Sequence, residues 1–288
     1  MTNKRRLQKL SPVAGIEVEG MDLASSLTSH GINQIKSWLD SYQIVVFRDQ
    51  YLSREAQSRL TSSFGPLEEH KGLSGSGDIT PSLHIIANID SGGNPVRLDP
   101  SDHNLFWHID KSYLSNPVQF SILHALETPK HGGDTQFANL YLAYNELEPK
   151  MKERLVGLRA RYTRGASKMV GRDINTDIQY ANDQNQQSTV SHPLIHTHPS
   201  TGRKLLFLDI HADHIEGQPQ EQGLKLLKDL LEHATQEKFI YTHNWLQGDV
   251  VIWDNRCLLH RAIPNFAMTA NRRILRRSLV RGFNPIQA

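Results

Sequence analysis

The tripeptide His108-Ile109-Asp110 pairs an imidazole with a carboxylate two residues apart. On a β-strand, side chains at this spacing point to the same face, so the two groups would converge on one point. A neutral imidazole and a carboxylate are two of the three ligands in the facial triad that holds non-haem Fe(II) and leaves coordination positions open. The same pattern recurs at His211-Ala212-Asp213, and a chain with 15 histidines is expected to contain chance copies. A third ligand is therefore needed before the pattern predicts a metal site.

Residues 248–261 supply a candidate third ligand, His260. This segment reads as a turn, an apolar strand over residues 250–253, a second turn, and a histidine on the following strand. Such a path can carry His260 to the same end of a barrel as His108. Zinc accepts the same three ligand types, so a zinc hydrolase is an alternative that the ligands alone leave open.

Arg273 and Arg277 lie four residues apart in a strand-like segment and would share a face. A solvated basic edge strand would explain them without any ligand. If they face into a barrel they need carboxylate partners, because an unpaired buried charge costs several kcal/mol, and a bound carboxylate would satisfy them. Arg272 and Arg276 would then point to solvent. Thr135, which follows a tight glycine turn, can add a hydroxyl hydrogen bond to the same carboxylate.

The elements that must position these residues are mostly short strands with turn signals between them. We therefore predict a mostly β fold with flanking helices and a double-stranded β-helix (jelly-roll) core, in one domain over residues 1–288. Strands are predicted over residues 44–47, 120–125, 135–137, 205–208, 239–245, 250–253 and 274–280, and helices over 31–42, after the cap at Ser53, over 140–155 and over 223–233. Two polar stretches, residues 71–104 and 166–192, are predicted to be irregular substrate loops.

The bulk composition excludes several classes of protein. A formal net charge of +2 argues against a dedicated nucleic-acid binder, and a single cysteine, Cys257, rules out an intramolecular disulfide framework. No run approaches the roughly 20 apolar residues of a membrane span. These features predict a soluble cytoplasmic protein with no nucleic-acid or membrane partner.

Several motifs besides the triad are recognisable, and with them the chain resembles the taurine dioxygenase/2,4-dichlorophenoxyacetate dioxygenase family of Fe(II)- and 2-oxoglutarate-dependent oxygenases. The resemblance runs from about Gly15 to Arg281. Its family-wide motifs are Phe64-Gly65-Pro66-Leu67, Gly132-Gly133-Asp134-Thr135, Thr201-Gly202-Arg203-Lys204 and Trp253-Asp254-Asn255-Arg256. The segments 211–217 and 231–236 are similar to the 2,4-dichlorophenoxyacetate branch in particular. Residues 71–104 match neither namesake well, and substrate choice would be determined there.

The resemblance assigns roles to individual residues. It implies that His108, Asp110 and His260 bind the iron, and that Arg273 and Thr135 bind the distal carboxylate of the co-substrate 2-oxoglutarate. It also implies four candidate substrate contacts, namely His70, His211, His214 and Arg277. O₂ is the third reactant, and relatives are often oligomers, so a homo-oligomer is expected.

The reaction implied by the resemblance is hydroxylation of a small, anionic organic substrate, with release of succinate and CO₂. The substrate would be an aryloxyalkanoate, a sulfonate or a similar carboxylate, and hydroxylation beside a leaving group would end in C–O or C–S cleavage. Asp110 favours hydroxylation over halogenation, because a missing carboxylate would leave a position for halide. The alternatives are a biosynthetic relative that desaturates, cyclises or hydroxylates an amino-acid or natural-product substrate, a zinc hydrolase, and a non-catalytic binding protein.

Overall fold

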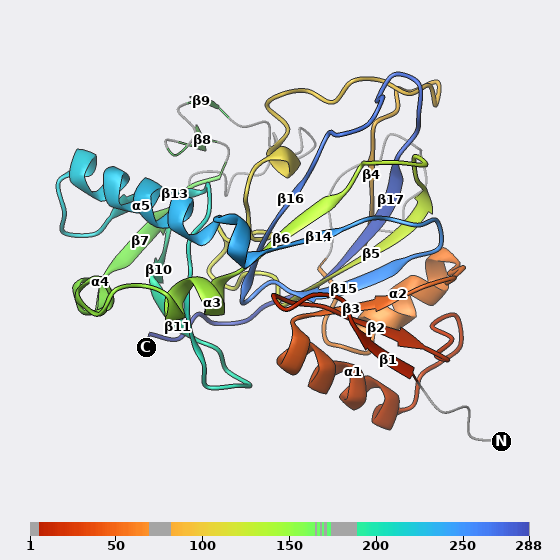
Figure 1. Ribbon diagram of the computed structural model, residues 1–288, viewed down its shortest axis with the longest axis horizontal. Coiled ribbons are helices and arrows are strands. Elements are labelled where there is room, and N and C mark those ends of the chain that lie inside the picture. Colours follow the sequence, from red (N-terminus) through yellow and green to blue (C-terminus); the bar gives the residue numbers. More distant parts are fainter. Residues whose placement is uncertain are drawn as a thin grey trace.

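A seven-stranded sheet in the order β1-β2-β3-β15-β5-β17-β4 forms the larger wall of the computed structural model (Figure 1). The structure describes residues 6–68, 82–164, 166–167, 169, 172–173 and 189–287. Neighbouring strands of this sheet are antiparallel, except that β2 and β3 are parallel. The strands are β1 (Arg6–Lys9), β2 (Ile16–Glu19), β3 (Ile44–Phe47), β4 (Leu83–Ala87), β5 (Phe120–Glu127), β15 (Val250–Asp254) and β17 (Ile274–Val280).

A three-stranded antiparallel sheet in the order β14-β6-β16 forms the second wall. Its strands are β14 (Ile240–His243), β6 (Thr135–Asn139) and β16 (Leu258–Ala262). One hydrophobic cluster includes Leu123 and Leu275 from the large sheet together with Phe137 and Leu259 from the small one. This is the predicted mostly β architecture, a jelly-roll core with flanking helices.

The remaining elements lie beside this core, with α3, α4 and α5 grouped near β7, β10 and β13 (Figure 1). Three smaller sheets pair β10-β7-β13, β11-β12 and β8-β9. The strands are β7 (Arg159–Tyr162), β8 (Ala166–Ser167), β9 (Arg172–Asp173), β10 (Val190–Pro193), β11 (Ile195–Thr197), β12 (Lys204–Leu206) and β13 (Ala212–Ile215). The helices are α1 (Ser29–Tyr42), α2 (Arg54–Ser62), α3 (Leu140–Asn145), α4 (Pro149–Leu155) and α5 (Gln220–Ala234), with 3₁₀ turns η1 (His103–Leu105) and η3 (Glu237–Phe239).

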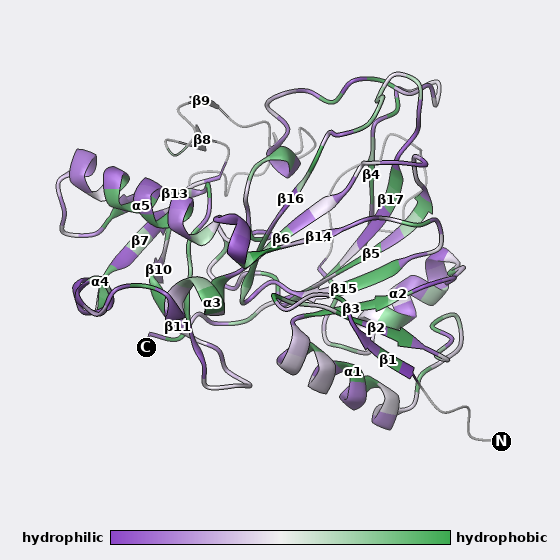
Figure 2. Ribbon diagram, viewed as in Figure 1, coloured by the Kyte–Doolittle hydropathy of each residue, from purple (hydrophilic) through white to green (hydrophobic). Residues whose placement is uncertain are grey.

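Strand β15 is buried along its whole length because both faces of the large sheet are covered. Val250 and Ile252 belong to a cluster that α1 and α2 close, whereas Val251 and Trp253 belong to the cluster between the sheets. The alternation of a strand's side chains produces this division. Figure 2 shows β15 and β5 in green, the hydrophobic end of the scale, and much of α4 and α5 in purple. The continuous apolar sequence of β15 is therefore a consequence of its central position.

Helix α2 begins where the sequence predicts. The side chain of Ser53 accepts a hydrogen bond from the backbone N–H of Ala56, which satisfies one of the donors left open at a helix start. The predicted helix over 140–155 is instead two short helices, α3 and α4. The break precedes Pro149, because proline disfavours helical geometry in the residue before it and is well suited to the first turn of a new helix.

Strand β4 is the main departure from the sequence prediction. It lies within residues 71–104, the stretch predicted to be irregular, and it pairs with β17 at the edge of the sheet. β17 is therefore an interior strand, which excludes the solvated edge-strand explanation of its arginines.

Among the described residues, no helix is long and apolar enough to cross a membrane.

The prediction that Arg276 points to solvent is wrong, whereas that for Arg272 is confirmed. Arg276 is 5% exposed and lies beneath α2, where its Nε donates to Gln57 Oε1 at 2.7 Å and its Nη2 to Leu52 O at 2.7 Å. The side chain of Arg272 is 43% exposed and pairs with Glu127 at 2.9 Å. Packing of α2 on the outer face of β17 accounts for the difference.

Candidate active site

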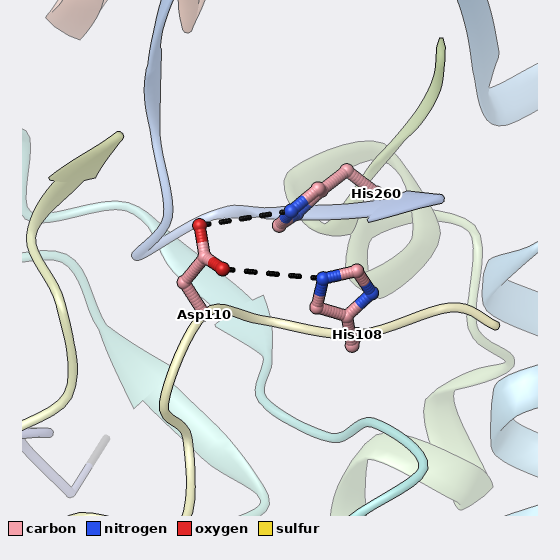
Figure 3. A group of neighbouring side chains, drawn as sticks. All are labelled: His108, Asp110 and His260. Carbon is pink, nitrogen blue, oxygen red and sulfur yellow. Dashed lines mark ion pairs between the residues drawn. The ribbon is translucent and has the colours of Figure 1, made fainter. Parts of the chain in front are cut away.

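Three side chains converge at one end of the core. His108, Asp110 and His260 point toward one another in Figure 3, and each offers a ligand atom within 4.8 Å of the others. Nε2 of His108 lies 4.0 Å from Asp110 Oδ1, and Nε2 of His260 lies 3.7 Å from Asp110 Oδ2. All three residues are buried. The structure thus brings together the three predicted metal ligands.

The backbone achieves this convergence differently from the predicted strand. His108 and His260 form an isolated antiparallel bridge, in which each backbone N–H donates to the other residue's carbonyl at 3.0 Å. Asp110 follows at the start of a turn, and Lys111 takes a left-handed conformation with φ of 54°. A single bridge and a turn, rather than an extended strand, place the carboxylate beside both imidazoles.

The charge state of the three side chains suits a divalent cation. Nδ1 of His108 donates to Phe106 O at 2.8 Å, so the lone pair of the neutral ring is on Nε2, which has no hydrogen-bond partner among the described residues. Burial is the main cause that lowers the pKa of His108 to about 4 and that of His260 to about 3. Burial opposes ionisation of Asp110, but Arg277 and the two histidines hold its pKa well below the usual value. Two neutral imidazoles and a carboxylate fit Fe(II) and leave positions open.

Further donors fix the carboxylate of Asp110. Arg277 Nη1 donates to Oδ1 at 3.0 Å, and Ser121 Oγ donates to Oδ2 at 2.5 Å. Asn255 Nδ2 donates in turn to Ser121 Oγ, and Trp253 Nε1 donates to Asn255 Oδ1 at 3.1 Å. Partners of this kind orient a metal ligand and are worth about 10–100-fold in metal affinity or activity.

Arg273 and Thr135 form the predicted cationic pair. Arg273 is 6% exposed, and its Nη2 donates to Thr135 Oγ1 at 3.2 Å while its Nε donates to Gly133 O at 2.6 Å. Trp245 Nε1 also donates to Thr135 Oγ1, at 2.9 Å. Because Oγ1 already accepts from two donors, the threonine hydroxyl hydrogen can be donated to a ligand. Burial lowers the pKa of Arg273 to about 10, so the guanidinium stays charged at neutral pH.

The glycine turn that precedes Thr135 is sterically required. Gly132 and Gly133 have φ of 76° and 71°, in the left-handed region that favours glycine. A Cβ on Gly132 would lie 2.2 Å from the backbone oxygen of Asn265, and one on Gly133 would lie 3.1 Å from Arg273 Cδ. The turn can therefore approach the guanidinium only without side chains.

The two histidines of the triad, Arg277 and the Arg273–Thr135 pair line one pocket between the two sheets, with a volume of about 340 Å³. Trp253, Leu275 and Leu123 contribute apolar walls, and Asn104 contributes an amide that the sequence analysis missed. Asn104 lies on η1, so its place beside the pocket depends on a turn that carries no motif. A second pocket of about 530 Å³ adjoins the first, since Ile86, Asn104, Ala262 and Arg273 line both.

The four predicted substrate contacts have different outcomes. His70 lies outside the described residues. Arg277 lies beside the triad and pairs with Asp110. His211 is 2% exposed and lies 3.2 Å, measured from its Nδ1, from Asp209 Oδ2. His214 is partly exposed on β13. Asp209 is a further residue that the sequence analysis missed, because no motif marks it.

Solved structures with the same fold cover nearly the whole chain. The crystal structure of AAD-2 in complex with Mn(II) and N-oxalylglycine is 30% identical, with a TM-score of 0.79, and the match covers 98% of each chain. A taurine dioxygenase from Burkholderia xenovorans is 28% identical, also with a TM-score of 0.79, over 98% of this chain and 93% of that one. The fold and the site together define a non-haem iron dioxygenase with a jelly-roll core.

The sequence comparisons identify the family within this class. Residues 6–279 match the model of the taurine catabolism dioxygenase TauD, TfdA family, and the chain belongs to that family. The alpha-ketoglutarate-dependent 2,4-dichlorophenoxyacetate dioxygenase of Burkholderia sp. (strain RASC) is 37% identical over 95% of this chain and 93% of that protein. The (S)-phenoxypropionate/alpha-ketoglutarate-dioxygenase of Sphingobium herbicidovorans is 34% identical over 88% of each.

These relationships confirm the predicted reaction class. The protein is a dioxygenase that uses Fe(II), O₂ and 2-oxoglutarate (alpha-ketoglutarate) and releases succinate and CO₂. A zinc hydrolase and a non-catalytic jelly roll are not favoured, because both would leave the Arg273–Thr135 pair without a purpose.

Proposed function

We propose that His108, Asp110 and His260 bind the Fe(II), and that Arg273 and Thr135 bind the distal carboxylate of 2-oxoglutarate. The observation that carries this proposal is that both histidines of the His, His, Asp cluster line the same pocket as a buried guanidinium beside a hydroxyl that can donate. When bound, the iron supplies, with 2-oxoglutarate and O₂, the oxidising power for hydroxylating a C–H bond.

The protein's own residues position the reactants. Arg273 supplies charge-assisted hydrogen bonds to a carboxylate, and Thr135 adds one more. Trp245 and Gly133 keep these two side chains in place through the hydrogen bonds described above. The apolar walls at Leu123 and Leu275 limit the water that can reach the reacting carbon.

We propose further that the substrate is an aryloxyalkanoate or a similar small carboxylate. The relatives named above, at 37% and 34% identity, carry names that specify 2,4-dichlorophenoxyacetate and (S)-phenoxypropionate. Arg277 and His211 are the candidate contacts for its anionic group, with His214 and His70 as further candidates. Hydroxylation of the carbon that bears the aryloxy group places one oxygen atom of O₂ on that carbon and the other in succinate. The resulting hemiacetal or hemiketal then loses the aryloxy group as a phenol and leaves a 2-oxo acid.

A substrate panel tests this proposal. Purified enzyme with Fe(II) and 2-oxoglutarate would be given aryloxyacetates, aryloxypropionates, taurine, alkyl sulfates and amino-acid derivatives, and succinate, O₂ uptake and phenol would be measured. We expect aryloxyalkanoates alone to couple succinate to O₂ near one to one and to yield an equal amount of phenol. Coupled turnover only with another compound would overturn the substrate class and leave the reaction class standing.

Natural products are a further group of compounds for the panel. The chain is 27% identical to the pentalenolactone F synthase of Streptomyces arenae, over 85% of each chain.

We also propose that the enzyme acts in the cytoplasm as a homo-oligomer. Its single cysteine is buried, in keeping with a reducing compartment. Light scattering should give a mass that is a multiple of the 32.7 kDa chain, and a mass of one chain would refute the oligomer.

A further inference from the structure

The buried carboxylate of Asp249 joins the two walls of the core. Asp249 comes directly before β15, and its backbone oxygen accepts from Ala125 N on β5 at 2.8 Å, so its backbone belongs to the large sheet. Its side-chain Oδ2 lies 3.1 Å from Nε2 of His243, the last residue of β14 in the small sheet. Arg48, which follows β3, donates to the same oxygen and pairs with its charge. Asp249 is therefore a charge-paired anion that reaches from one sheet to the other.

The ring of His243 is fixed by hydrogen bonds at both of its nitrogens. An ionised carboxylate only accepts, so Nε2 carries the hydrogen and donates to Asp249. Nδ1 is then the acceptor, and the hydroxyl of Tyr241, 3.1 Å away, donates to it. Burial is the main cause that lowers the pKa of His243, so the ring is neutral at neutral pH. A buried neutral ring with both nitrogens engaged has one preferred orientation.

This arrangement holds Trp245 from two sides. The rings of His243 and Trp245 meet edge to face, with centroids 4.6 Å apart and planes at 83°. Asp249 Oδ2 also accepts from the backbone N–H of Leu246 at 2.9 Å, which fixes the chain just after the indole. Trp245 Nε1 in turn donates to Thr135 Oγ1 at 2.9 Å. A continuous set of contacts thus leads from Asp249 to a hydroxyl that lines the pocket.

The orientation of the Asp249 carboxylate is not explained by stability alone. Within the described ranges, Oδ1 is buried and has no hydrogen-bond partner, an arrangement that costs stability. The donors that the structure describes all meet Oδ2, which is the oxygen that accepts from His243 and Leu246. The carboxylate is therefore turned toward the segment that carries Trp245.

We propose that Asp249 and His243 are positioning residues for 2-oxoglutarate, which act through Trp245 on the hydroxyl of the pocket. They hold the indole where it donates to Thr135. Because Arg273 donates to the same Oγ1, the hydroxyl hydrogen is left for the distal carboxylate. Without the indole, the hydroxyl could turn to other partners. The inference rests on the proposed function, which places that carboxylate at Arg273 and Thr135.

Two inert chelators that differ only at the distal end test this role. N-oxalylglycine carries the distal carboxylate, and N-methyloxamate has a methyl group in place of the carboxymethyl group. Calorimetry on protein loaded with Mn(II) would give the Kd of each. The variants are Asp249→Asn, His243→Phe, Trp245→Phe and the double variant His243→Phe/Trp245→Phe.

The chain offers a matched control at the other end of β15. His198 and Asp254 form a second buried pair, also with 3.1 Å between Nε2 and Oδ2, and Arg256 donates to the same carboxylate oxygen. The ring of His198 contacts Tyr141 rather than Trp245. His198→Phe therefore removes an equivalent buried hydrogen bond away from Thr135.

We expect each single variant at the three positions to weaken N-oxalylglycine binding about 3–10-fold, which corresponds to about 0.7–1.4 kcal/mol, the contribution of one hydrogen bond. N-methyloxamate binding should change less than about twofold, as should both Kd values in His198→Phe. The double variant should be no weaker than Trp245→Phe, because His243 acts through Trp245. In turnover, the KM for 2-oxoglutarate should rise with kcat nearly unchanged.

Three results would overturn the positioning role. The first is equal weakening of both chelators by His243→Phe, which would make the pair a general support of the fold. The second is an additive loss in the double variant, and the third is a loss in His198→Phe as large as that in His243→Phe. His243→Phe and Trp245→Phe decide the question if Asp249→Asn does not fold.

Arg273→Gln separates failure of this inference from failure of the proposed function. Wild-type affinity of Arg273→Gln for N-oxalylglycine would overturn the proposed 2-oxoglutarate site, and the inference with it. Weaker binding in Arg273→Gln, together with unchanged binding in the Asp249 and His243 variants, would overturn the inference alone.

Discussion

The chain contains two His-x-Asp segments. Both histidines are buried, and within the described part of the chain neither Nε2 has a hydrogen-bond partner, yet the two segments have different surroundings. Nδ1 of His108 donates to a backbone carbonyl, and Asp110 lies beside it with His260 opposite. Nδ1 of His211 donates to the carboxylate of Asp209, and Asp213 accepts from Thr163 instead.

The partner of Nδ1 explains the difference. A neutral carbonyl leaves His108 a neutral imidazole, which is the form that binds a metal. Nδ1 of His211 instead faces the buried carboxylate of Asp209, which also accepts from the backbone N–H of Ile109 and from Ser112 Oγ. The same three-residue pattern therefore occurs in two different surroundings, and the partner of Nδ1 distinguishes them.

The largest expected effect separates the two aspartates. Asp110→Ala removes a metal ligand and should reduce substrate-triggered O₂ uptake by more than about 100-fold. This loss exceeds the roughly 10–100-fold loss that follows removal of a residue that only hydrogen-bonds to a ligand. Asp213→Ala should stay within about twofold of wild type. Coupled succinate formation that survives in Asp110→Ala would contradict the assignment of the triad.

A similar contrast applies to two adjacent arginines. Arg273→Gln should raise the KM for 2-oxoglutarate about 10–100-fold, because it removes a buried charged donor. Arg272→Gln breaks only an exposed pair with Glu127 and should leave that KM nearly unchanged. Equal KM values for the two variants would argue that 2-oxoglutarate binds elsewhere.

Ser121→Ala probes the support of Asp110 rather than the ligand itself. It removes the donor to Oδ2, and we expect about 10-fold weaker Fe(II) binding, measured anaerobically. The double variant Ser121→Ala/Asn255→Ala should bind Fe(II) more weakly still, because Asn255 Oδ1 also accepts a hydrogen bond from the backbone N–H of Asp110. Fe(II) affinity equal to that of wild type would show that Arg277 alone fixes the carboxylate.

A smaller effect is expected in the stability of the metal-free protein. His108 and His260 have folded-state pKa values lowered to about 4 and about 3, against about 6.5 in an unfolded chain. Between pH 6.5 and 4 the unfolded chain takes up protons that the folded chain does not, so the free energy of unfolding should fall as pH falls. Urea unfolding at several pH values should show a shallower fall in the double variant His108→Gln/His260→Gln. An unchanged slope would mean that these rings are protonated in the folded metal-free protein.

The sequence predicted those site residues that belong to motifs. His108 and Asp110 could be found from their two-residue spacing, and His260, Arg273 and Thr135 because they lie in or beside strands with a clear apolar pattern or follow a glycine turn. Asn104 and Asp209 could not, because each depends on a loop whose path is set by long-range packing. The error at Arg276 has a similar origin, since the packing of α2 on the outer face of β17 is a long-range contact that the sequence does not reveal.

The central claim is that the first His-x-Asp segment, with His260, binds one iron per chain. Anaerobic equilibrium dialysis with Fe(II) and 2-oxoglutarate measures this directly, with Asp110→Ala and Asp213→Ala side by side. The account predicts one Fe(II) per chain for wild type and for Asp213→Ala, and loss of binding in Asp110→Ala. Unchanged Fe(II) affinity in Asp110→Ala, or loss in Asp213→Ala, would contradict it.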